Sequence, residues 1–338
     1  MTRKRNIKSF APPRFSLAQL PTPIEILPLS PVPDSKIEIF IKRDDLTGSV
    51  LSGNKIRKLE FLFYDLIRKK SDLVITCGGV QSNHCRAVAA LCATSGIECR
   101  LVLKGRRPKI PDGNFFLSTL TGAKSTFITA GEYEKNVDSI MKNMARRYKR
   151  KGKRPYVIPE GGSDPLGVWG YIKALEEIKG QVVRSKIKID AIACAVGSGG
   201  TYAGLYLGSR VIGWDVQLVG FAVSRNARYF EKKIFDICQA TERDVGRNLE
   251  IRPEEFDIDD RFIGPGYGRI GPLETDFIRE VAANSGIILD PAYTSKALLG
   301  LFERIREGSF RDGSRLLFIH TGGQWGLFPQ RAKLVGAE

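Results

Sequence analysis

Histidine is scarce in this chain of 338 residues, and long apolar runs are absent. Only two histidines occur, His84 and His320, and none of the six cysteines forms a CxxC pair. A zinc site needs thiolates and imidazoles at short spacings, so the sequence predicts no metal site. No apolar run approaches the roughly 20 residues that span a bilayer, so no association with a membrane is expected.

The N-terminus also lacks the features of a secretory signal. Its sequence MTRKRNIKSFAPPRF is basic, but it has no apolar segment and no small-residue cleavage site. Cys85 and Cys92 fall in an alanine-rich segment, where cysteine is most often a small buried side chain. We therefore expect all six cysteines to be reduced and structural, and the protein to be cytoplasmic.

Acidic residues are scarcer than basic ones. The chain has 53 Lys and Arg against 37 Asp and Glu, a formal net charge of +16. Basic residues such as those in MARRYKRKGKR (144–154) could contact phosphates, but no zinc finger or aromatic-interleaved recognition module accompanies them. The balance predicts a basic surface on a soluble enzyme, which favours anionic ligands, and no nucleic-acid partner.

Strand and helix patterns alternate along the chain. The hydrophobic fraction of 42% and the charged fraction of 27% are typical of a soluble globular protein. RKLEFLFYDLIRKK (57–70) has apolar residues at helical spacing with charge on the other face, and 82–96 predicts a helix closed by Gly96. Apolar segments predict strands at 37–44, 72–79, 97–105, 154–162, 189–200, 216–223 and 315–323. This alternation predicts an α/β fold with open, mainly parallel sheets flanked by helices.

A lysine in SGNKIRKLE (52–60) raises the first functional question. Lys55 follows Ser-Gly-Asn and precedes a predicted helix. Lysine usually lies on the solvated face of a helix, and this stretch alone does not exclude that interpretation.

A glycine-rich loop in AVGSGGTYAGL (195–205) is a candidate phosphate site. It follows a predicted strand and opens a predicted helix. Gly197, Gly199 and Gly200 let backbone N–H groups converge at a helix N-terminus, and Thr201 adds a hydroxyl. The loop is neither a Walker loop nor a GxGxxG fingerprint, and a tight strand-helix turn stays an alternative.

A second polar strand-helix junction lies in CGGVQSNHCR (77–86). Gln81, Ser82, Asn83 and His84 enter the predicted helix one after another. Serine or asparagine at a helix start is usually an N-cap. Four hydrogen-bonding side chains exceed what a cap requires, so this junction is a candidate site for a substrate carboxylate.

Seven motifs together carry a family resemblance. SGNKIRKLE, GGVQSNHCR, PEGGSDPLG, GSGGT, GPGYG, DPAYTSKA and FIHTGG occur in this order across residues 40–326. The chain resembles the family of D-cysteine desulfhydrase and 1-aminocyclopropane-1-carboxylate (ACC) deaminase, which are pyridoxal 5'-phosphate (PLP) enzymes of the tryptophan-synthase-β fold type. The resemblance implies a large domain of residues 1–55 plus 164–338, a small domain of 56–163, PLP in the cleft between them, and a homodimer.

The resemblance also implies roles for individual residues. Lys55 matches the lysine that binds PLP covalently, which requires a desolvated, deprotonated amine rather than a solvated one. The implied cofactor-binding set is Asn54, Lys55, Lys58, Asn83, Gly197, Ser198, Gly199, Gly200, Thr201 and Thr321. The implied substrate-binding set is Ser82, Asn83, His84 and Thr294. The implied catalytic set is Lys55, Ser82, Tyr267 and Tyr293.

Two threonines favour one branch of the family. In the deaminases a glutamate follows the tyrosine of the DPxY motif, and a leucine precedes the final Gly-Gly. Thr294 and Thr321 stand at these positions here, which is the desulfhydrase pattern. The expected reaction is β-elimination of D-cysteine to pyruvate, hydrogen sulfide and ammonia, with Lys55 or Ser82 accepting the α-proton. The alternatives are another β-substituted amino acid such as L-cysteate, ACC deamination, or a non-catalytic PLP-binding or nucleic-acid-binding protein.

Overall fold

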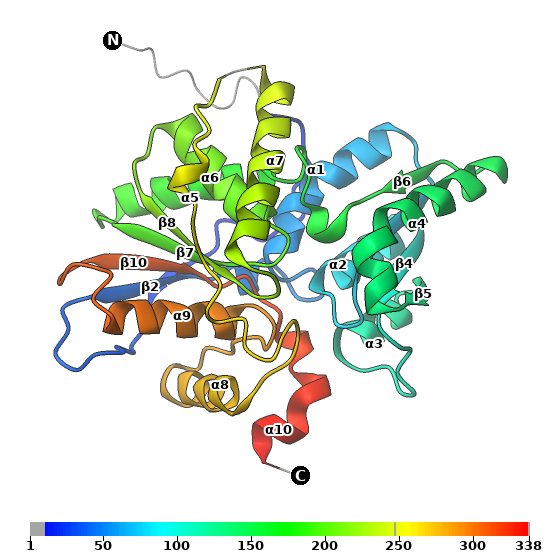
Figure 1. Ribbon diagram of the computed structural model, residues 1–338. Coiled ribbons are helices and arrows are strands. Elements are labelled where there is room, and N and C mark those ends of the chain that lie inside the picture. Colours follow the sequence, from blue (N-terminus) through cyan, green and yellow to red (C-terminus); the bar gives the residue numbers. More distant parts are fainter. Residues whose placement is uncertain (1–10, 247, 337–338) are drawn as a thin grey trace.

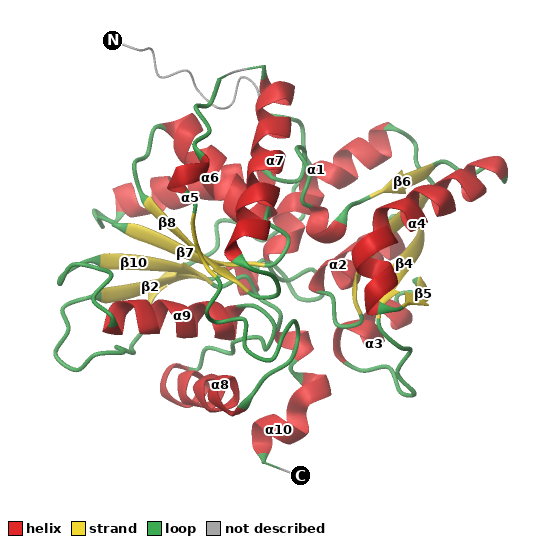
Figure 2. Cartoon of the chain, in the orientation of Figure 1, coloured by secondary structure: helices red, strands yellow, loops and turns green. Residues whose placement is uncertain are grey.

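Two sheets, each flanked by helices, make up the fold. The computed structural model describes residues 11–246 and 248–336, so residues 1–10 of the basic N-terminus and of the predicted large domain lie outside the described part. The two sheets form two lobes side by side (Figure 1). Helices surround the strands in both lobes (Figure 2).

The larger sheet has six strands, and only one pairing in it, between β1 and β2, is antiparallel. Its strands in spatial order are β1 (Ile24–Ile26), β2 (Glu38–Lys42), β10 (Arg315–Ile319), β7 (Ala191–Val196), β8 (Gln217–Ala222) and β9 (Asp257–Asp259). The mainly parallel α/β fold predicted from the sequence is confirmed.

Helices cover both faces of the larger sheet because its central strands are apolar on both sides. One face carries α5 (Trp169–Arg184), α6 (Gly200–Ile212) and α7 (Ala227–Val245), and the other carries α8 (Pro272–Ser285) and α9 (Thr294–Arg306) (Figure 1). Along β7, Cys194 and Val196 pack with the first group. Ala193 and Ala195 alternate with them and pack with the second group.

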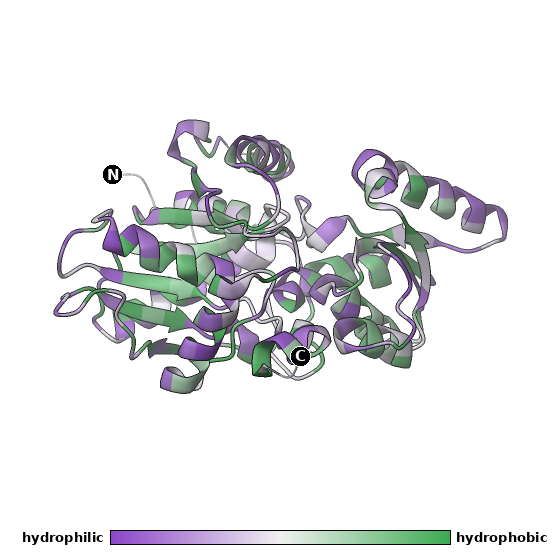
Figure 3. Cartoon of the chain, turned by 60° about the horizontal axis from the view of Figure 1, so that its bottom comes forward, coloured by the Kyte–Doolittle hydropathy of each residue, from purple (hydrophilic) through white to green (hydrophobic). Residues whose placement is uncertain are grey.

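The smaller sheet is entirely parallel. Its order is β5 (Lys124–Ile128), β4 (Glu98–Lys104), β3 (Leu73–Gly79) and β6 (Pro155–Val157). Its helices are α2 (Asn83–Thr94), α3 (Gly113–Leu120) and α4 (Ala130–Arg150). Val74 of β3 packs towards α2, and Ile75 packs towards α4. The strands of both lobes are hydrophobic, whereas α4 alternates between hydrophobic and hydrophilic residues (Figure 3).

Helix α1 (Asn54–Arg68) lies between the two lobes (Figure 1). Ile56 and Leu62 belong to the core of the smaller lobe, and Phe61 belongs to that of the larger lobe. The predicted helix is confirmed, but it begins three residues before the 57–70 segment. The domain limits inferred from the resemblance stay a prediction, and α1 spans the first of them.

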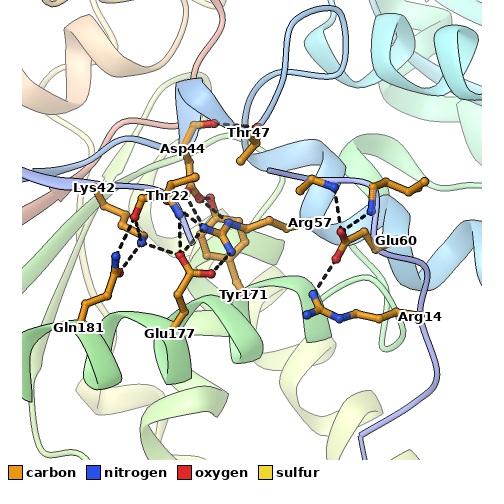
Figure 4. A network of polar contacts seen from close by, with 12 residues as sticks. Arg14, Thr22, Lys42, Asp44, Thr47, Arg57, Glu60, Tyr171, Glu177 and Gln181 are labelled. Carbon is orange, nitrogen blue, oxygen red and sulfur yellow. Dashed lines mark hydrogen bonds and ion pairs between the residues drawn. The ribbon is translucent and has the colours of Figure 1, made fainter. Parts of the chain in front are cut away.

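The charged residues in the first turns of α1 are buried, whereas Arg68 near its end is exposed. Arg57 is only 1% exposed, and its Nη2 lies 2.7 Å from Asp44 Oδ1 (Figure 4). Its Nη1 lies 2.9 Å from Glu177 Oε2. Glu60 accepts hydrogen bonds from the backbone N–H groups of Leu17 and Ala18. Local periodicity cannot reveal these partners, because they are distant in the sequence.

Some strand predictions were wrong in extent. The strand predicted over 154–162 ends at Val157, since Pro159 and the positive φ angles of Gly161 and Gly162 stop it. Strands β1, β5 and β9 were not predicted, because each is short and at most partly apolar.

A short helix, α10 (Arg331–Val335), lies at the C-terminal end of the described part. All six cysteines are buried and have free thiols. Among the described residues, no helix is long and apolar enough to cross a membrane, and no cluster of side chains could hold a metal ion.

Candidate active site

A pocket lies where the carboxyl ends of strands from both sheets meet the start of α1. This is the usual ligand position in open parallel sheets, because the loops after neighbouring strands converge there. The pocket encloses about 360 Å³, including solvent at its mouth. Its lining consists of Asn54, Lys55, Asn83, Ala195, Gly197, Ser198, Gly199, Thr201, Tyr293 and Thr321. Every lining residue except Ala195 belongs to the sets inferred from the sequence.

Lys55 lies in the first turn of α1, and its side chain is buried. Burial lowers the pKa of Lys55 to about 8, and the negative charges of Glu160 and Asp290 offset part of that effect. Its Nζ lies 5.8 Å from the ring centroid of Tyr293. The amine therefore loses its proton more readily than a solvated lysine does.

Gly53 fixes the position of Lys55 from the preceding turn. Its φ of 97° suits glycine, and a Cβ there would lie 2.7 Å from the carbonyl oxygen of Thr321. That same carbonyl accepts a hydrogen bond of 3.1 Å from the N–H of Asn54. The close approach of the two backbones brings Lys55 and Thr321 to one pocket.

The glycine-rich loop leads into α6 with its backbone open towards the pocket. The first N–H groups of a helix have no intrahelical partner and suit an anion. A Cβ on Gly200 would lie 2.5 Å from Ser163 Oγ and 2.8 Å from Lys58 Nζ. The absence of a side chain at Gly200 thus lets Ser163 and Lys58 approach the start of α6 closely.

Lys58 lies fully buried behind the loop. Its Nζ is 3.2 Å from Ser163 Oγ and 3.4 Å from the carbonyl oxygen of Gly161, and it forms no ion pair within 11–246 and 248–336. Burial and the positive charge of Lys55 hold the pKa of Lys58 well below its usual value. An anionic group at the loop would stabilise its charged form.

Two asparagines complete the polar lining. Asn54 Nδ2 donates to Thr201 Oγ1 at 3.0 Å, which links α1 to α6 across the pocket. Asn83 Oδ1 accepts from Asn114 Nδ2 at 2.9 Å. Asn114 thereby orients the Asn83 amide so that its nitrogen stays available for another partner.

Of the two predicted tyrosines, Tyr293 lines the pocket, and Tyr267 contacts it from outside the lining. Their hydroxyl oxygens, of Tyr267 and Tyr293, are 2.5 Å apart, and either can donate. Burial raises the pKa of both phenols. A Cβ on Gly197 would lie 2.6 Å from Tyr293 Cε1, so the glycine loop also makes room for this ring.

Three predicted substrate ligands are not among the lining residues. Ser82 Oγ accepts a hydrogen bond of 3.1 Å from Cys85 N as the N-cap of α2. His84 Nε2 lies 2.9 Å from Thr76 Oγ1. Thr294 Oγ1 donates to Asp290 Oδ1 at 2.9 Å. Each of these side chains thus has a hydrogen-bond partner at a helix start or in the buried interior. Contact with a substrate stays a prediction for all three residues.

The inferred sets omitted three residues that shape the site. Asp290 accepts hydrogen bonds from the N–H groups of Ala292, Tyr293 and Thr294, and so fixes the start of α9. Glu160 accepts one from the hydroxyl of Tyr133. Ser163 Oγ lies 2.8 Å from Ser198 Oγ. All three fall inside quoted motifs, DPAYTSKA and PEGGSDPLG, which were the available signals.

Comparison with known proteins decides the family. The profile of the family described as "Pyridoxal-phosphate dependent enzyme" matches residues 15–322. The chain belongs to this family. PLP is accordingly the cofactor of this enzyme.

Individual relatives of this PLP enzyme carry two activities in their names. A Thermotoga maritima protein is 41% identical over 324 residues, covering 95% of this chain and 100% of its own, and is named provisionally as an ACC deaminase. An Arabidopsis thaliana protein, 38% identical over 95% of this chain and 82% of its own, is named "Bifunctional D-cysteine desulfhydrase/1-aminocyclopropane-1-carboxylate deaminase, mitochondrial". A solved "ACC deaminase homologue" is 37% identical, with a TM-score of 0.87 over 97% of each chain.

The residues around the pocket fit PLP. A buried lysine with a pKa of about 8 suits covalent attachment of an aldehyde, since the neutral amine is the nucleophile. The glycine loop at Gly200 suits the phosphate, as does Lys58, which has no ion pair among the described residues. Lys55 and Lys58 stand three residues apart in α1, so they lie on the same face of the helix.

Proposed function

We propose that this PLP-dependent enzyme is a carbon–sulfur lyase that converts D-cysteine and water to pyruvate, hydrogen sulfide and ammonia. One observation carries the proposal. The pocket lining includes Thr321, whose side chain is a hydroxyl, and no acidic residue is among the described residues that line it. A hydroxyl suits a neutral ring nitrogen, whereas a carboxylate would favour a protonated one. A neutral ring is a modest electron sink, which suits loss of a β-substituent better than opening of a cyclopropane.

The proposed roles begin with Lys55. When bound, PLP supplies the electron sink that stabilises negative charge at the substrate Cα. Lys55 would hold PLP covalently, and its amine, once the substrate amino group has displaced it, would accept the α-proton; the pKa of the free amine is about 8. Ser82 is the second candidate for that proton, although its oxygen already caps α2. Borohydride reduction in the presence of PLP, followed by peptide mapping, tests Lys55, and label on a different lysine contradicts its role.

The other residues bind and orient. Lys58 and the loop 197–201 hold the phosphate, and Asn54 and Asn83 bind polar groups of the ring. The N-terminus of α2 receives the substrate carboxylate through Ser82 and Asn83. Burial keeps the phenols of Tyr267 and Tyr293 protonated, so this pair donates hydrogen bonds at the site, and the sulfur departs as hydrosulfide.

Contact of His84 and Thr294 with the substrate stays a prediction, on which this proposal does not depend. The Thr294 hydroxyl is bound to Asp290, and the His84 imidazole is bound to Thr76. Burial and the nearby charges of Lys55 and Lys58 also hold the pKa of His84 well below its usual value, which favours the neutral imidazole.

ACC deamination is the second candidate. The names of the Thermotoga relative and of the solved homologue favour it, and the Arabidopsis name includes both activities. Another β-substituted amino acid such as L-cysteate is the third, because a net charge of +16 favours an anionic substrate.

A substrate panel tests the proposal. Holoenzyme is incubated with D-cysteine, L-cysteine, β-chloroalanine, L-cysteate and ACC, and pyruvate, sulfide and 2-oxobutyrate are measured. Pyruvate and sulfide from D-cysteine, with little 2-oxobutyrate from ACC, are expected. Dominant 2-oxobutyrate selects the second candidate, and pyruvate from L-cysteate alone selects the third. No product from any compound contradicts a lyase. Sedimentation of the same preparation tests the homodimer.

A further inference from the structure

The segment that carries Tyr267 is a loop with three glycines, in which Pro265 is the residue with a ring-restricted backbone. It runs from 263 to 268, between β9 and α8, and reads IGPGYG. Gly264, Gly266 and Gly268 have positive φ angles of 61°, 116° and 67°. Glycines at such angles leave many conformations open to the chain, so contacts from outside must hold the tyrosine in place.

Lys296 provides such contacts. Its side chain is fully buried in α9, and its Nζ donates to the carbonyl oxygens of Ile263 and Gly266, each at 2.6 Å. Among the described residues, Lys296 forms no ion pair. A buried ammonium whose hydrogen bonds go to two carbonyls of one loop acts as a clamp on that loop.

The same helix also holds the partner of Tyr267. Tyr293 is the N-cap of α9, three residues before Lys296, and it lines the pocket. Its hydroxyl oxygen lies 2.5 Å from that of Tyr267. Helix α9 therefore positions one tyrosine directly and the other through Lys296.

We propose that Lys296 is a positioning residue, which holds the loop 263–268 so that the Tyr267 hydroxyl stays bonded to that of Tyr293. Lys296 lies outside the pocket lining and acts through Tyr267. Its kinetic effect rests on the proposed function, whereas the anchoring of the loop does not.

Hydrogen–deuterium exchange tests the anchoring without any substrate. Arg269 N donates to the Gly266 carbonyl at 3.2 Å, so its amide reports on the loop that Lys296 binds. Lys296→Met keeps the length of the side chain and removes its donors. We expect exchange in the 263–271 peptide to rise about tenfold, with the α8 and α9 peptides unchanged. Lys296→Gln can still donate to one carbonyl, so its exchange rate in this peptide should lie between those of the wild type and Lys296→Met. It replaces the methionine variant if that variant does not fold.

Arg304→Met is the matched control. Arg304 is also a cation of α9, but its Nη1 pairs with Asp257 Oδ1 at 2.6 Å and does not contact the loop. Exchange at 263–271 in this variant should equal that of the wild type. Unchanged exchange in the Lys296 variants, or an equal rise in Arg304→Met, overturns the anchoring.

A double-mutant cycle tests the action through Tyr267. With any turned-over amino acid of the panel, Lys296→Met should lower kcat/KM about tenfold in the wild type and less than about threefold in a Tyr267→Phe background. PLP content should stay unchanged. Equal losses in both backgrounds overturn a role through Tyr267. If no amino acid is turned over, the proposed function fails, and the exchange experiment still decides on the clamp.

Discussion

Two lysines of α1 are buried for different chemical reasons. Lys55 and Lys58 lie one turn apart; burial lowers the pKa of both amines, and the charge of Lys55 lowers that of Lys58 further. For Lys55 the result is an amine that is partly neutral near physiological pH. Lys58 has hydrogen bonds but no ion pair within the described residues, so its charge needs an anion from outside the chain. A phosphorylated aldehyde satisfies both lysines at once.

The hydroxyl of Ser82 caps a helix, and we propose that it also binds the substrate carboxylate. It caps α2 through Cys85 N, and its side chain is only 5% exposed. Ser82→Ala should lower the free energy of unfolding by about 1 kcal/mol through loss of the cap. It should also lower kcat/KM by about tenfold or more, since a hydrogen bond to a charged carboxylate contributes about 1.5–3 kcal/mol. PLP content should stay unchanged.

A second N-cap separates these two effects. Asn226 Oδ1 accepts a hydrogen bond of 3.0 Å from Tyr229 N at the start of α7 and does not line the pocket. Asn226→Ala should reproduce the loss of stability without the loss of kcat/KM. Ser82 is only a cap if both variants behave alike in denaturation and in kinetics.

Among the elements, α1 depends most on contacts from elsewhere in the chain. Arg57 bonds both Asp44 and Glu177, and Lys42 and Gln181 extend the same network (Figure 4). Burial alone would raise the pKa of Asp44, but Arg57 beside it lowers it. This network joins α1 to the larger lobe. It lies on the face of α1 that points away from the smaller lobe.

Removing Arg57 should destabilise the fold strongly. Arg57→Met leaves the buried carboxylate of Asp44 without its main partner, which should cost about 3–5 kcal/mol in urea denaturation at neutral pH. Because the folded pKa of Asp44 is lowered, the wild type gains this stabilisation above the ordinary pKa of a carboxyl group and loses it as pH falls. The difference in free energy of unfolding between wild type and variant should therefore become smaller at acidic pH.

An exposed arginine is the control for this measurement. Arg261 pairs with Asp259 and Glu307, but its side chain is 50% exposed. Arg261→Met should cost less than about 1 kcal/mol. Similar losses in both variants would contradict a special role for the buried network.

The whole molecule brings the carboxyl ends of two sheets to one cleft. The loop after β3 contributes Asn83, the loop after β7 contributes Gly197 and Ser198, and the loop after β10 contributes Thr321. A ligand in this cleft contacts both lobes and binds only the folded protein.

PLP should therefore stabilise the folded state. At a hundredfold excess over its Kd, a ligand of the folded state contributes roughly 2.7 kcal/mol, so adding PLP to cofactor-free protein should raise Tm by several degrees. Gly200→Ala should abolish this rise, because its Cβ meets Ser163 and Lys58. Gly131→Ala, where a Cβ has open space, should keep it. An undiminished rise in Gly200→Ala would contradict a phosphate site at the glycine loop.

Much of the pocket could be predicted from the sequence, because its residues stand in short motifs at strand ends. Thr201 was inferred from its glycine loop, and Asn54 and Lys55 from the family resemblance; all three line the pocket. Thr294 was inferred by resemblance alone, and His84 from its polar junction and the resemblance; both side chains bond to buried protein groups. A motif gives a residue's place in the chain but does not give the direction of its side chain.

The α/β alternation could be predicted from local sequence patterns, and the family and its cofactor from the order of the motifs. These are local properties, since strand and helix periods and glycine loops are set by neighbours in the chain. Three features are visible only in the folded structure. Arg57 and Lys58 are buried, Ser163 lies beside Ser198, and Lys296 bonds to the Tyr267 loop. Those contacts join segments up to more than a hundred residues apart, and no local pattern encodes them.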